Sequence, residues 1–259
     1  MEMDGKFAAI TGAGSGLGEA AAVKLAQQGA DIALIGRTEK ELRQVAERIE
    51  AMGRRALVVT ADVADEKAMR SGLKAISDEF GRIDFLFANA GVNGVWAPLD
   101  ELPYEEWNRT MSINLGGTFL TIHTALPLMM KHGGSILITS SINGTRTFTT
   151  AGASAYATTK AGQLALGQMA AIELAKYKIR VNVICPGAIG TEISDNTDQR
   201  NVEKAAVAAE YPDGEIPLTA GTPGTSEDVA NLVAFFASDR SRHITGTPVW
   251  IDGGQSLLV

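Results

Sequence analysis

Residues 7–18 read Phe7-Ala-Ala-Ile-Thr-Gly-Ala-Gly-Ser-Gly-Leu-Gly18, a short apolar run that leads directly into a glycine-rich turn. The apolar run predicts a buried strand, and the amphipathic stretch 17–29 after the turn predicts a helix. Glycine lets a backbone turn sharply and approach a phosphate closely, and a helix start offers free N–H groups and a positive dipole end. The spacing Gly12-x-x-x-Gly16-x-Gly18 lacks the Gly-Lys-Ser/Thr ending of a Walker loop. We therefore predict a phosphate-binding turn between the first strand and the first helix.

Short apolar runs alternate with segments of helix length along the whole chain. Such runs are typical of parallel strands that are buried on both faces. The alternation predicts an α/β fold, a Rossmann-like doubly wound parallel sheet of about seven strands with helices on both faces. The expected strands are Phe7–Ile10, Ile32–Ile35, Ala56–Val59, Ile83–Phe87, Ser135–Ile138, Val181–Ile184 and Pro248–Ile251. The expected helices span residues 17–29, 39–52, 65–80, 104–131 and 154–177.

Local signals refine these boundaries. Thr38-Glu-Lys-Glu41 predicts a capping box, while Gly29 and Gly53 stand where a helix commonly stops. No linker or repeat divides the chain, so residues 1–259 are expected to form a single domain. The irregular zone at about 188–225, with a possible short helix Val202–Tyr211, predicts a substrate loop. A plain surface excursion is the alternative reading of that zone.

The composition excludes several classes of function. The net charge of −7 argues against a nucleic-acid partner. Cys185 is the only cysteine, which rules out an intrachain disulfide framework and fits a reducing compartment. The three histidines lie far apart, so no dedicated metal site is expected. The chain has no apolar signal region and no run near about eighteen apolar residues, so we expect a cytoplasmic protein without a membrane partner.

The end of the second strand bears on which dinucleotide the glycine turn would hold. An acidic residue there would bind the ribose 2′-hydroxyl of NAD, but this chain has Gly36-Arg37-Thr38 instead. The Arg37 guanidinium suits a 2′-phosphate, and the Thr38 hydroxyl could add a donor. The residues therefore favour NADP as the cofactor, with NAD as the alternative. Arg37 could also stack on adenine without contacting a phosphate.

Tyr156 and Lys160 are four residues apart, so on the helix expected at 154–177 they lie one turn apart on one face. An ammonium beside a phenol favours the phenolate, which predicts an acid/base role for this pair. Asn89 and Ser141 follow the fourth and fifth strands, and Asn114 lies in the long middle helix. Because the carboxyl ends of parallel strands meet at one sheet edge, these residues are expected to converge. Ser140 is the rival of Ser141, and Asn114 could be only a helix-kink residue.

These motifs, in this order, resemble the short-chain dehydrogenase/reductase family, in its single-domain type of about 250 residues. The resemblance covers essentially the whole chain. Its further motifs are Pro186-Gly187 with Thr191 and the ending Ile244-Thr-Gly246…Ile251-Asp-Gly-Gly254. It implies a catalytic set of Asn114, Ser141, Tyr156 and Lys160. It also implies a cofactor-binding set of Gly12, Ser15, Gly16, Leu17, Gly18, Arg37, Thr38, Asp62, Val63, Asn89, Ala90, Gly91, Tyr156, Lys160, Pro186, Gly187, Ile189 and Thr191.

The resemblance also implies a role for each catalytic residue. Tyr156 would exchange the proton with the substrate oxygen, and Ser141 would hydrogen-bond that oxygen. Lys160 would lower the pKa of Tyr156 and hold the nicotinamide ribose, while Asn114 would support a water chain to solvent. The family habit is a homotetramer, built partly from the helices expected at 104–131 and 154–177.

The function expected from these residues is an NAD(P)-dependent oxidoreductase that interconverts a secondary alcohol and a ketone. A cofactor-sensing binding protein without turnover, and an epimerase or dehydratase, are the alternatives. The stretch between Ser141 and Tyr156 is longer than in many relatives, so the substrate-pocket wall is expected to be unusual. Substrate contacts are expected from Asn93–Trp96, Asn143–Ala151 and residues 188–225. Acyl-thioester ketones, sugars, steroid-like ketones and small xenobiotic ketones all remain open.

Overall fold

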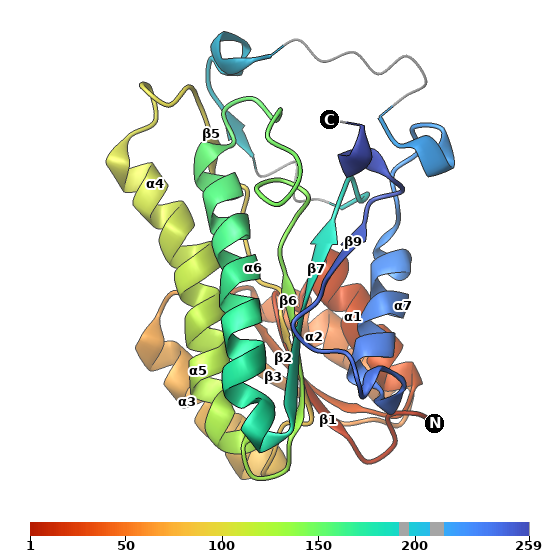
Figure 1. Ribbon diagram of the computed structural model, residues 1–259. Helices are drawn as coiled ribbons and strands as arrows, with labels where there is room; N and C mark the ends of the chain where they lie inside the picture. The colour runs from red at the N-terminus through yellow and green to blue at the C-terminus, as the bar shows by residue number, and fades with distance from the viewer. Residues whose placement is uncertain (192–196, 208–214, 259) are drawn as a thin grey trace.

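The computed structural model describes residues 1–191, 197–207 and 215–258. Its central element is a parallel sheet of seven strands in the order β3-β2-β1-β4-β6-β7-β9 (Figure 1). The order reverses between β1 and β4, which places a topological switch point at the middle of the sheet. The strands are β1 (Phe7–Thr11), β2 (Asp31–Gly36), β3 (Ala56–Thr60), β4 (Phe85–Ala88), β6 (Gly134–Thr139), β7 (Ile179–Pro186) and β9 (Pro248–Ile251). The predicted doubly wound α/β fold is confirmed.

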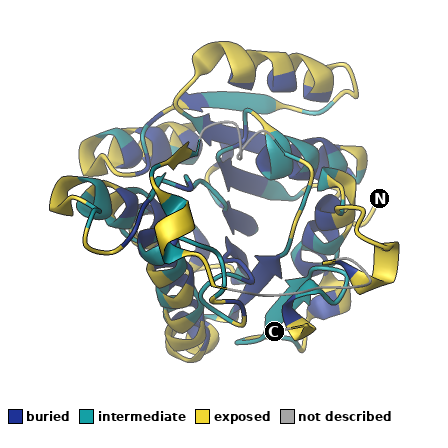
Figure 2. Cartoon of the chain, turned by 90° about the horizontal axis from the view of Figure 1, so that it is seen from above, coloured by how far each residue is buried: buried dark blue, intermediate teal, exposed yellow. Residues whose placement is uncertain are grey.

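Helices cover both faces of the sheet. One apolar core lies between the sheet and α3, α5 and α6, and the other lies between the sheet and α1, α2 and α7. Figure 2 shows the strands dark blue at the centre, while the outer faces of the helices are exposed. The helices are α1 (Gly16–Gln27), α2 (Glu39–Glu50), α3 (Glu66–Phe80), α4 (Tyr104–Met111), α5 (Gly117–Met129), α6 (Ser154–Leu174) and α7 (Ser226–Ala237).

The long helix expected at 104–131 is divided. A π-helical turn, Ser112–Gly116, separates α4 from α5, and Asn114 lies within it. Such turns often occur at functional sites because they redirect one side chain. The helix expected at 154–177 ends in a 3₁₀ turn, Ala175–Tyr177.

The predicted capping box at Thr38 is wrong, because the Thr38 side chain makes no cap hydrogen bond at the start of α2. A reciprocal box occurs instead at α7, between Thr225 and Asp228. The expected turn glycines behave as predicted, since Gly29 and Gly53 have φ values of 105° and 75°.

Residues 197–207 contain two short elements that the sequence did not indicate as such. The strand β8 (Asp198–Gln199) pairs in parallel with β5 (Val95–Trp96), forming a two-stranded sheet beside the main one. A 3₁₀ turn, Val202–Ala205, occupies the start of the short helix expected at Val202–Tyr211. The remainder of that expected helix beyond Val207 lies outside the described residues. The other 3₁₀ turns are Pro217–Thr219, Asp239–Ser241 and Gln255–Leu257.

Candidate active site

The glycine turn after β1 has a backbone conformation and close contacts that exclude side chains at several positions. Gly12 and Gly16 have φ values of 66° and 53°, which favour glycine. A Cβ on Gly18 would lie 2.0 Å from the Gly12 carbonyl oxygen, and one on Gly12 would lie 3.0 Å from the Ala90 Cα. The turn therefore packs against itself and against the end of β4, and it leads into the N-terminus of α1. This geometry fits a bound pyrophosphate, with Ser15 exposed at the N-cap and Leu17 partly buried in the first turn.

Thr11 links this turn to the neighbouring strand. Its hydroxyl accepts hydrogen bonds from the backbone N–H groups of Asn89 and Ala90 at 3.0 and 3.1 Å. The Asn89 amide in turn donates to the Thr11 carbonyl at 3.2 Å and accepts from the Thr139 hydroxyl at 3.1 Å. The carboxyl ends of β1, β4 and β6 are thereby tied together.

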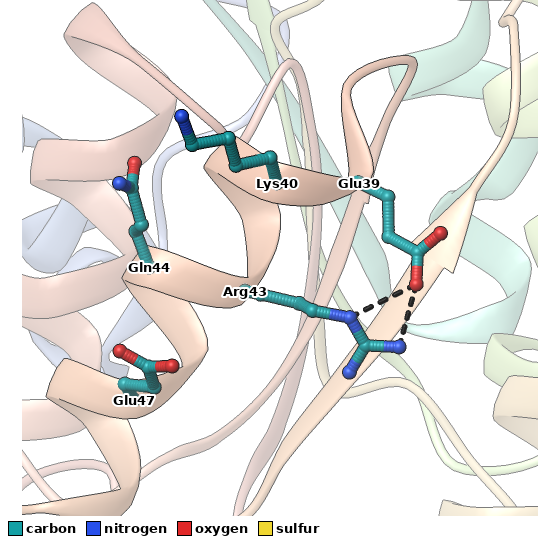
Figure 3. Close-up of a pocket in the computed structure, with 5 residues that line it drawn as sticks. All are labelled: Glu39, Lys40, Arg43, Gln44 and Glu47. Carbon is teal, nitrogen blue, oxygen red and sulfur yellow. Dashed lines mark hydrogen bonds and ion pairs between the residues drawn. The ribbon is translucent and has the colours of Figure 1, made fainter.

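The end of β2 presents Arg37 and Thr38, both exposed. Within the described part of the chain, the Arg37 side chain has no ion pair and no hydrogen bond. Figure 3 shows the next turn, where Arg43 binds the Glu39 carboxylate at 2.5 and 2.9 Å and Lys40 extends away from that pair. These residues line an open, charged hollow on the outer surface of α2, which is distinct from the site around Tyr156.

Asp62 and Val63 follow β3. The Asp62 carboxylate accepts a hydrogen bond from the Ala64 N–H at 2.9 Å, which fixes its orientation. Val63 is buried, and it packs closely enough that a Cβ on Gly117 would lie 2.6 Å from its Cγ2. Val63 therefore forms part of the wall between the third strand and the start of α5.

Asn114 is fully buried, and its amide braces two segments. Its Oδ1 accepts from the Val92 N–H at 2.8 Å, and its Nδ2 donates to the Val92 carbonyl at 2.9 Å and to the Thr159 hydroxyl at 3.1 Å. A Cβ on Gly91 would lie 3.2 Å from Asn114 Oδ1 and 3.7 Å from Lys160 Nζ. The loop after β4 is therefore held against α6 at the turn that carries the Tyr156–Lys160 pair.

The two serines after β6 have different partners. The Ser140 hydroxyl donates to the Lys160 backbone carbonyl at 2.6 Å, so it fastens β6 to α6. The Ser141 hydroxyl accepts from the Asn143 N–H at 3.1 Å, and it lies close enough to the Tyr156 phenol to lower the pKa of that phenol. Ser141, and not Ser140, is thus the serine beside the phenol.

Lys160 is 3% exposed, and its ammonium donates to the Thr139 carbonyl at 3.0 Å. Burial lowers the pKa of Lys160 to about 8, and the nearby Cys185 sulfur acts in the opposite direction. Burial raises the pKa of Tyr156 above the ordinary phenol value, and the Ser141 hydrogen bond opposes that rise. The expected lowering of the Tyr156 pKa by Lys160 is therefore not the direction found, because burial of the phenol outweighs the stabilisation of its anion.

The loop after β7 closes the site from the other side. Thr191 lies over the glycine turn, where its Cβ and Cγ2 would be 3.6 Å from a Cβ on Gly16. A Cβ on Gly187 would lie 2.6 Å from the Asp252 Cβ, so Pro186-Gly187 passes tightly under the C-terminal segment. Ile189 forms a bridge with Gly224.

Sequence reasoning missed Gln255, whose Oε1 accepts a hydrogen bond from the Ala188 N–H at 2.8 Å. This glutamine fixes the loop that carries Gly187 and Ile189. The ending Ile251-Asp-Gly-Gly254 was noticed, but nothing in its spacing indicated a long-range bond from the next residue.

The structure thus gathers the predicted residues at one edge of the sheet. Asn114, Tyr156 and Lys160 form one connected cluster through Thr159, Thr139 and the contact of Lys160 with the Tyr156 ring, and Ser141 lies beside the phenol. The described residues contain no group of His, Cys, Asp and Glu that could hold a metal ion. In the same part of the chain, no helix is long and apolar enough to cross a membrane.

A family model described as "Enoyl-(Acyl carrier protein) reductase" matches residues 12–256. The chain is 37% identical to an L-rhamnose 1-dehydrogenase (NAD(P)(+)) of Sphingomonas sp. (strain SKA58), covering 98% of this chain and 97% of the relative. It is also 37% identical to levodione reductase of Leifsonia aquatica, covering 95% and 92%. A crystal structure of a 3-ketoacyl-ACP reductase from Sinorhizobium meliloti 1021 has a TM-score of 0.95 and 53% identity, covering 98% and 100%.

Two other similar structures hold different dinucleotides. A carveol dehydrogenase from Mycobacterium avium is in complex with NAD, at a TM-score of 0.87 and 30% identity, covering 99% of each chain. A short-chain dehydrogenase from Burkholderia cenocepacia J2315 is in complex with NADP, at a TM-score of 0.86 and 32% identity, covering 98% of this chain and 99% of that one.

Proposed function

This chain belongs to the short-chain dehydrogenase/reductase family and is an NAD(P)-dependent oxidoreductase of alcohols and ketones, and we propose that Tyr156 is its acid and base. The single observation that carries the proposal is the Tyr156 ring, whose centroid lies 5.3 Å from the ammonium of the buried Lys160, with Ser141 beside the phenol. Geometry of this kind lets one group exchange a proton with a substrate oxygen while a second group holds that oxygen.

The Tyr156 phenol is protonated at neutral pH, since burial raises its pKa above that of an ordinary phenol. A protonated phenol is the form that can donate to a ketone oxygen as that oxygen gains negative charge. Ser141 hydrogen-bonds the same oxygen and stabilises the developing charge. The bound cofactor supplies the hydride. Lys160, next to the phenol and tied to Thr139, is placed to contact the nicotinamide ribose and to return a proton to Tyr156.

We propose NADP as the preferred cofactor. The support is the exposed Arg37 guanidinium at the end of β2, where an NAD-binding chain would carry a carboxylate. The nearest carboxylate that follows, Glu39, is already bound by Arg43. Arg37 and Thr38 are therefore the groups placed to meet a 2′-phosphate.

We propose the other cofactor contacts as follows. The turn Gly12–Gly18 would hold the pyrophosphate, and Asp62 and Val63 would contact the adenine. Asn89–Gly91 and the segment Pro186–Thr191 would enclose the nicotinamide half. The support is the tight packing of these segments around one another, which leaves their backbones at the same sheet edge.

We also propose a homotetramer. The outer faces of α5 and α6 expose large apolar side chains, with Phe119 at 51%, Met169 at 72% and Ile172 at 81% exposure. Apolar surface of this kind commonly marks a contact between protein chains.

The cytoplasm remains the expected location, because the single cysteine, Cys185, is free and buried.

The test of the proposed function is a turnover assay with a panel of ketones and alcohols. Each compound is mixed with NADPH, NADH or the oxidised forms, and the nicotinamide absorbance is followed. We expect ketone-dependent oxidation of NADPH that exceeds that of NADH. A chain that binds the cofactor tightly but turns over no member of a broad panel would contradict the proposal.

A further inference from the structure

We propose that Trp96 determines substrate specificity by selecting ketones and alcohols whose reacting carbon belongs to an apolar ring. The inference rests on the proposed function, since it takes Tyr156 as the group that contacts the reacting oxygen. It narrows the substrate class, because the names of the similar proteins include substrates as different as L-rhamnose, levodione and 3-ketoacyl-ACP.

Trp96 stands directly beside the phenol. The ring centroids of Trp96 and Tyr156 are 6.5 Å apart, with an angle of 49° between the ring planes. Both residues are partly exposed, so neither is enclosed in the core. The indole therefore forms a wall next to the point where the substrate oxygen would bind, at a distance over which aromatic groups attract one another.

Hydrogen bonds of the Trp96 side chain and of the surrounding backbone position this residue. Its N–H donates to the Asn93 carbonyl at 3.2 Å, and its backbone carbonyl accepts from the Arg200 N–H at 2.9 Å. The next residue, Ala97, donates to the Gly152 carbonyl at 3.2 Å. The backbone bonds fix the Trp96 backbone against the residue after β8 and the loop before α6, and the N–H bond orients the ring before a ligand arrives, which favours binding of a rigid partner.

The polar groups around this wall are engaged with one another. The Asn93 amide donates to the Thr197 hydroxyl at 2.7 Å, and the Thr150 hydroxyl donates to the Asn143 amide oxygen at 2.7 Å. The indole N–H is used as well. A sugar placed here would lose water from several hydroxyls and would have to compete for these bonds, which is unfavourable. An apolar ring has no such requirement and gains from contact with the indole face.

The long loop between Ser141 and Tyr156 packs against the strand that carries Trp96. Gly152 passes so close to the strand that a Cβ there would lie 2.7 Å from the Ala97 N and 3.0 Å from the Trp96 carbonyl carbon. The loop thereby packs against the backbone of Trp96, while the Trp96 ring lies beside Tyr156.

The experiment compares cyclohexanone with 2-hexanone, an open-chain ketone of equal carbon number, and with L-rhamnose in the oxidative direction. The variants are Trp96→Ala, Trp96→Phe and the matched control Trp107→Ala, which removes a partly exposed tryptophan on α4. Cofactor affinity is measured for each variant by nicotinamide fluorescence, which also reports that the variant is folded.

We expect the wild type to prefer cyclohexanone over 2-hexanone in kcat/KM. Trp96→Ala should lower kcat/KM for cyclohexanone roughly tenfold, mostly through KM, and change 2-hexanone little. Trp96→Phe should retain most of the preference, and Trp107→Ala should leave it unchanged. Ketone turnover with a preference that is the same in wild type and Trp96→Ala would overturn this inference while leaving the proposed function intact, as would a stronger activity on L-rhamnose. Failure to turn over cyclohexanone, in a protein that turns over other ketones of the broad panel, would likewise overturn the inference and leave the proposed function intact.

Discussion

The Lys160 ammonium lies 5.3 Å from the centroid of the Tyr156 ring, and it donates to the Thr139 carbonyl at 3.0 Å. The Lys160 ammonium therefore lies near both the Tyr156 ring and the backbone of β6. Burial is the largest cause of the pKa shift at each residue, raising the pKa of Tyr156 and lowering that of Lys160. It also means that Lys160 carries a charge in a place where little water reaches it, and that condition has a measurable consequence.

Lys160 should make stability depend on pH in the alkaline range. Its pKa is about 8 in the folded chain, against 10.5 for the ordinary side chain. Between these values the unfolded chain binds the extra proton, so this residue makes the free energy of unfolding rise with pH. Over this range the free energy of unfolding changes by roughly 3 kcal/mol because of Lys160. The destabilisation by the buried charge is fully present below about pH 8.

The check is urea unfolding of the wild type and Lys160→Met at several pH values from 7 to 10.5. As the pH rises, the free energy of unfolding of the wild type should increase relative to that of Lys160→Met. A difference that stays constant across this range would show that Lys160 is not perturbed by burial.

Arg37→Asp should change the cofactor preference from NADP toward NAD. The substitution removes the guanidinium that we propose binds the 2′-phosphate, and it supplies a carboxylate for the ribose hydroxyls. Loss of a charged hydrogen bond of this kind weakens binding by on the order of tenfold to a hundredfold. The measurement is kcat/KM for NADPH and NADH with one ketone. Arg70→Asp, which makes the same charge change at a residue of α3 paired with Glu66, serves as the control and should leave the ratio nearly unchanged.

The segment 197–207 should support substrate binding through the Arg200–Glu106 ion pair. The guanidinium contacts both carboxylate oxygens at 2.5 and 2.6 Å, and it lies next to the β5–β8 pairing that carries Trp96. Because both side chains are partly exposed, the pair is worth no more than about 1 kcal/mol. Glu106→Gln should therefore raise the KM of a cyclic ketone by roughly threefold to fivefold.

The same variant should leave the KM of the cofactor unchanged, since the ion pair is remote from the glycine turn. Lys74→Gln, which breaks the exposed pair with Asp78 on α3, is the matched control. Equal effects of Glu106→Gln and Lys74→Gln on the ketone KM would argue against a supporting role for this segment.

The outer faces of α5 and α6 should form a contact between subunits. Light scattering is expected to give the mass of four chains. Replacing Met169 and Ile172 with glutamate places charge on two side chains that are 72% and 81% exposed, so the double variant should dissociate without unfolding. A wild type that scatters as a monomer would refute the expected assembly.

The sequence predicted the seven strands well because each is a continuous apolar run, and a parallel sheet buried on both faces requires such runs. The glycine turn was predictable for a similar reason, since positions such as Gly18 tolerate no side chain. These are properties of short segments, and a single sequence carries them directly.

Other features depend on contacts between distant segments. The π-helical turn at Asn114 interrupts a stretch whose periodicity is that of one helix, and β5 and β8 are two-residue strands that exist only by pairing with each other. The direction of the Tyr156 pKa also depends on burial, which the spacing to Lys160 does not reveal. At Thr38 the local pattern of a capping box was present, yet the side chain makes no cap bond.

The central claim, that Tyr156 exchanges the proton of the reaction, is tested most directly by Tyr156→Phe. The assay is NADPH-dependent reduction of the best ketone from the panel, with cofactor affinity measured in parallel by fluorescence. We expect turnover to fall roughly 10²- to 10⁴-fold while the Kd for NADPH changes little. A variant that keeps most of its turnover would contradict the assignment of Tyr156 as the acid and base.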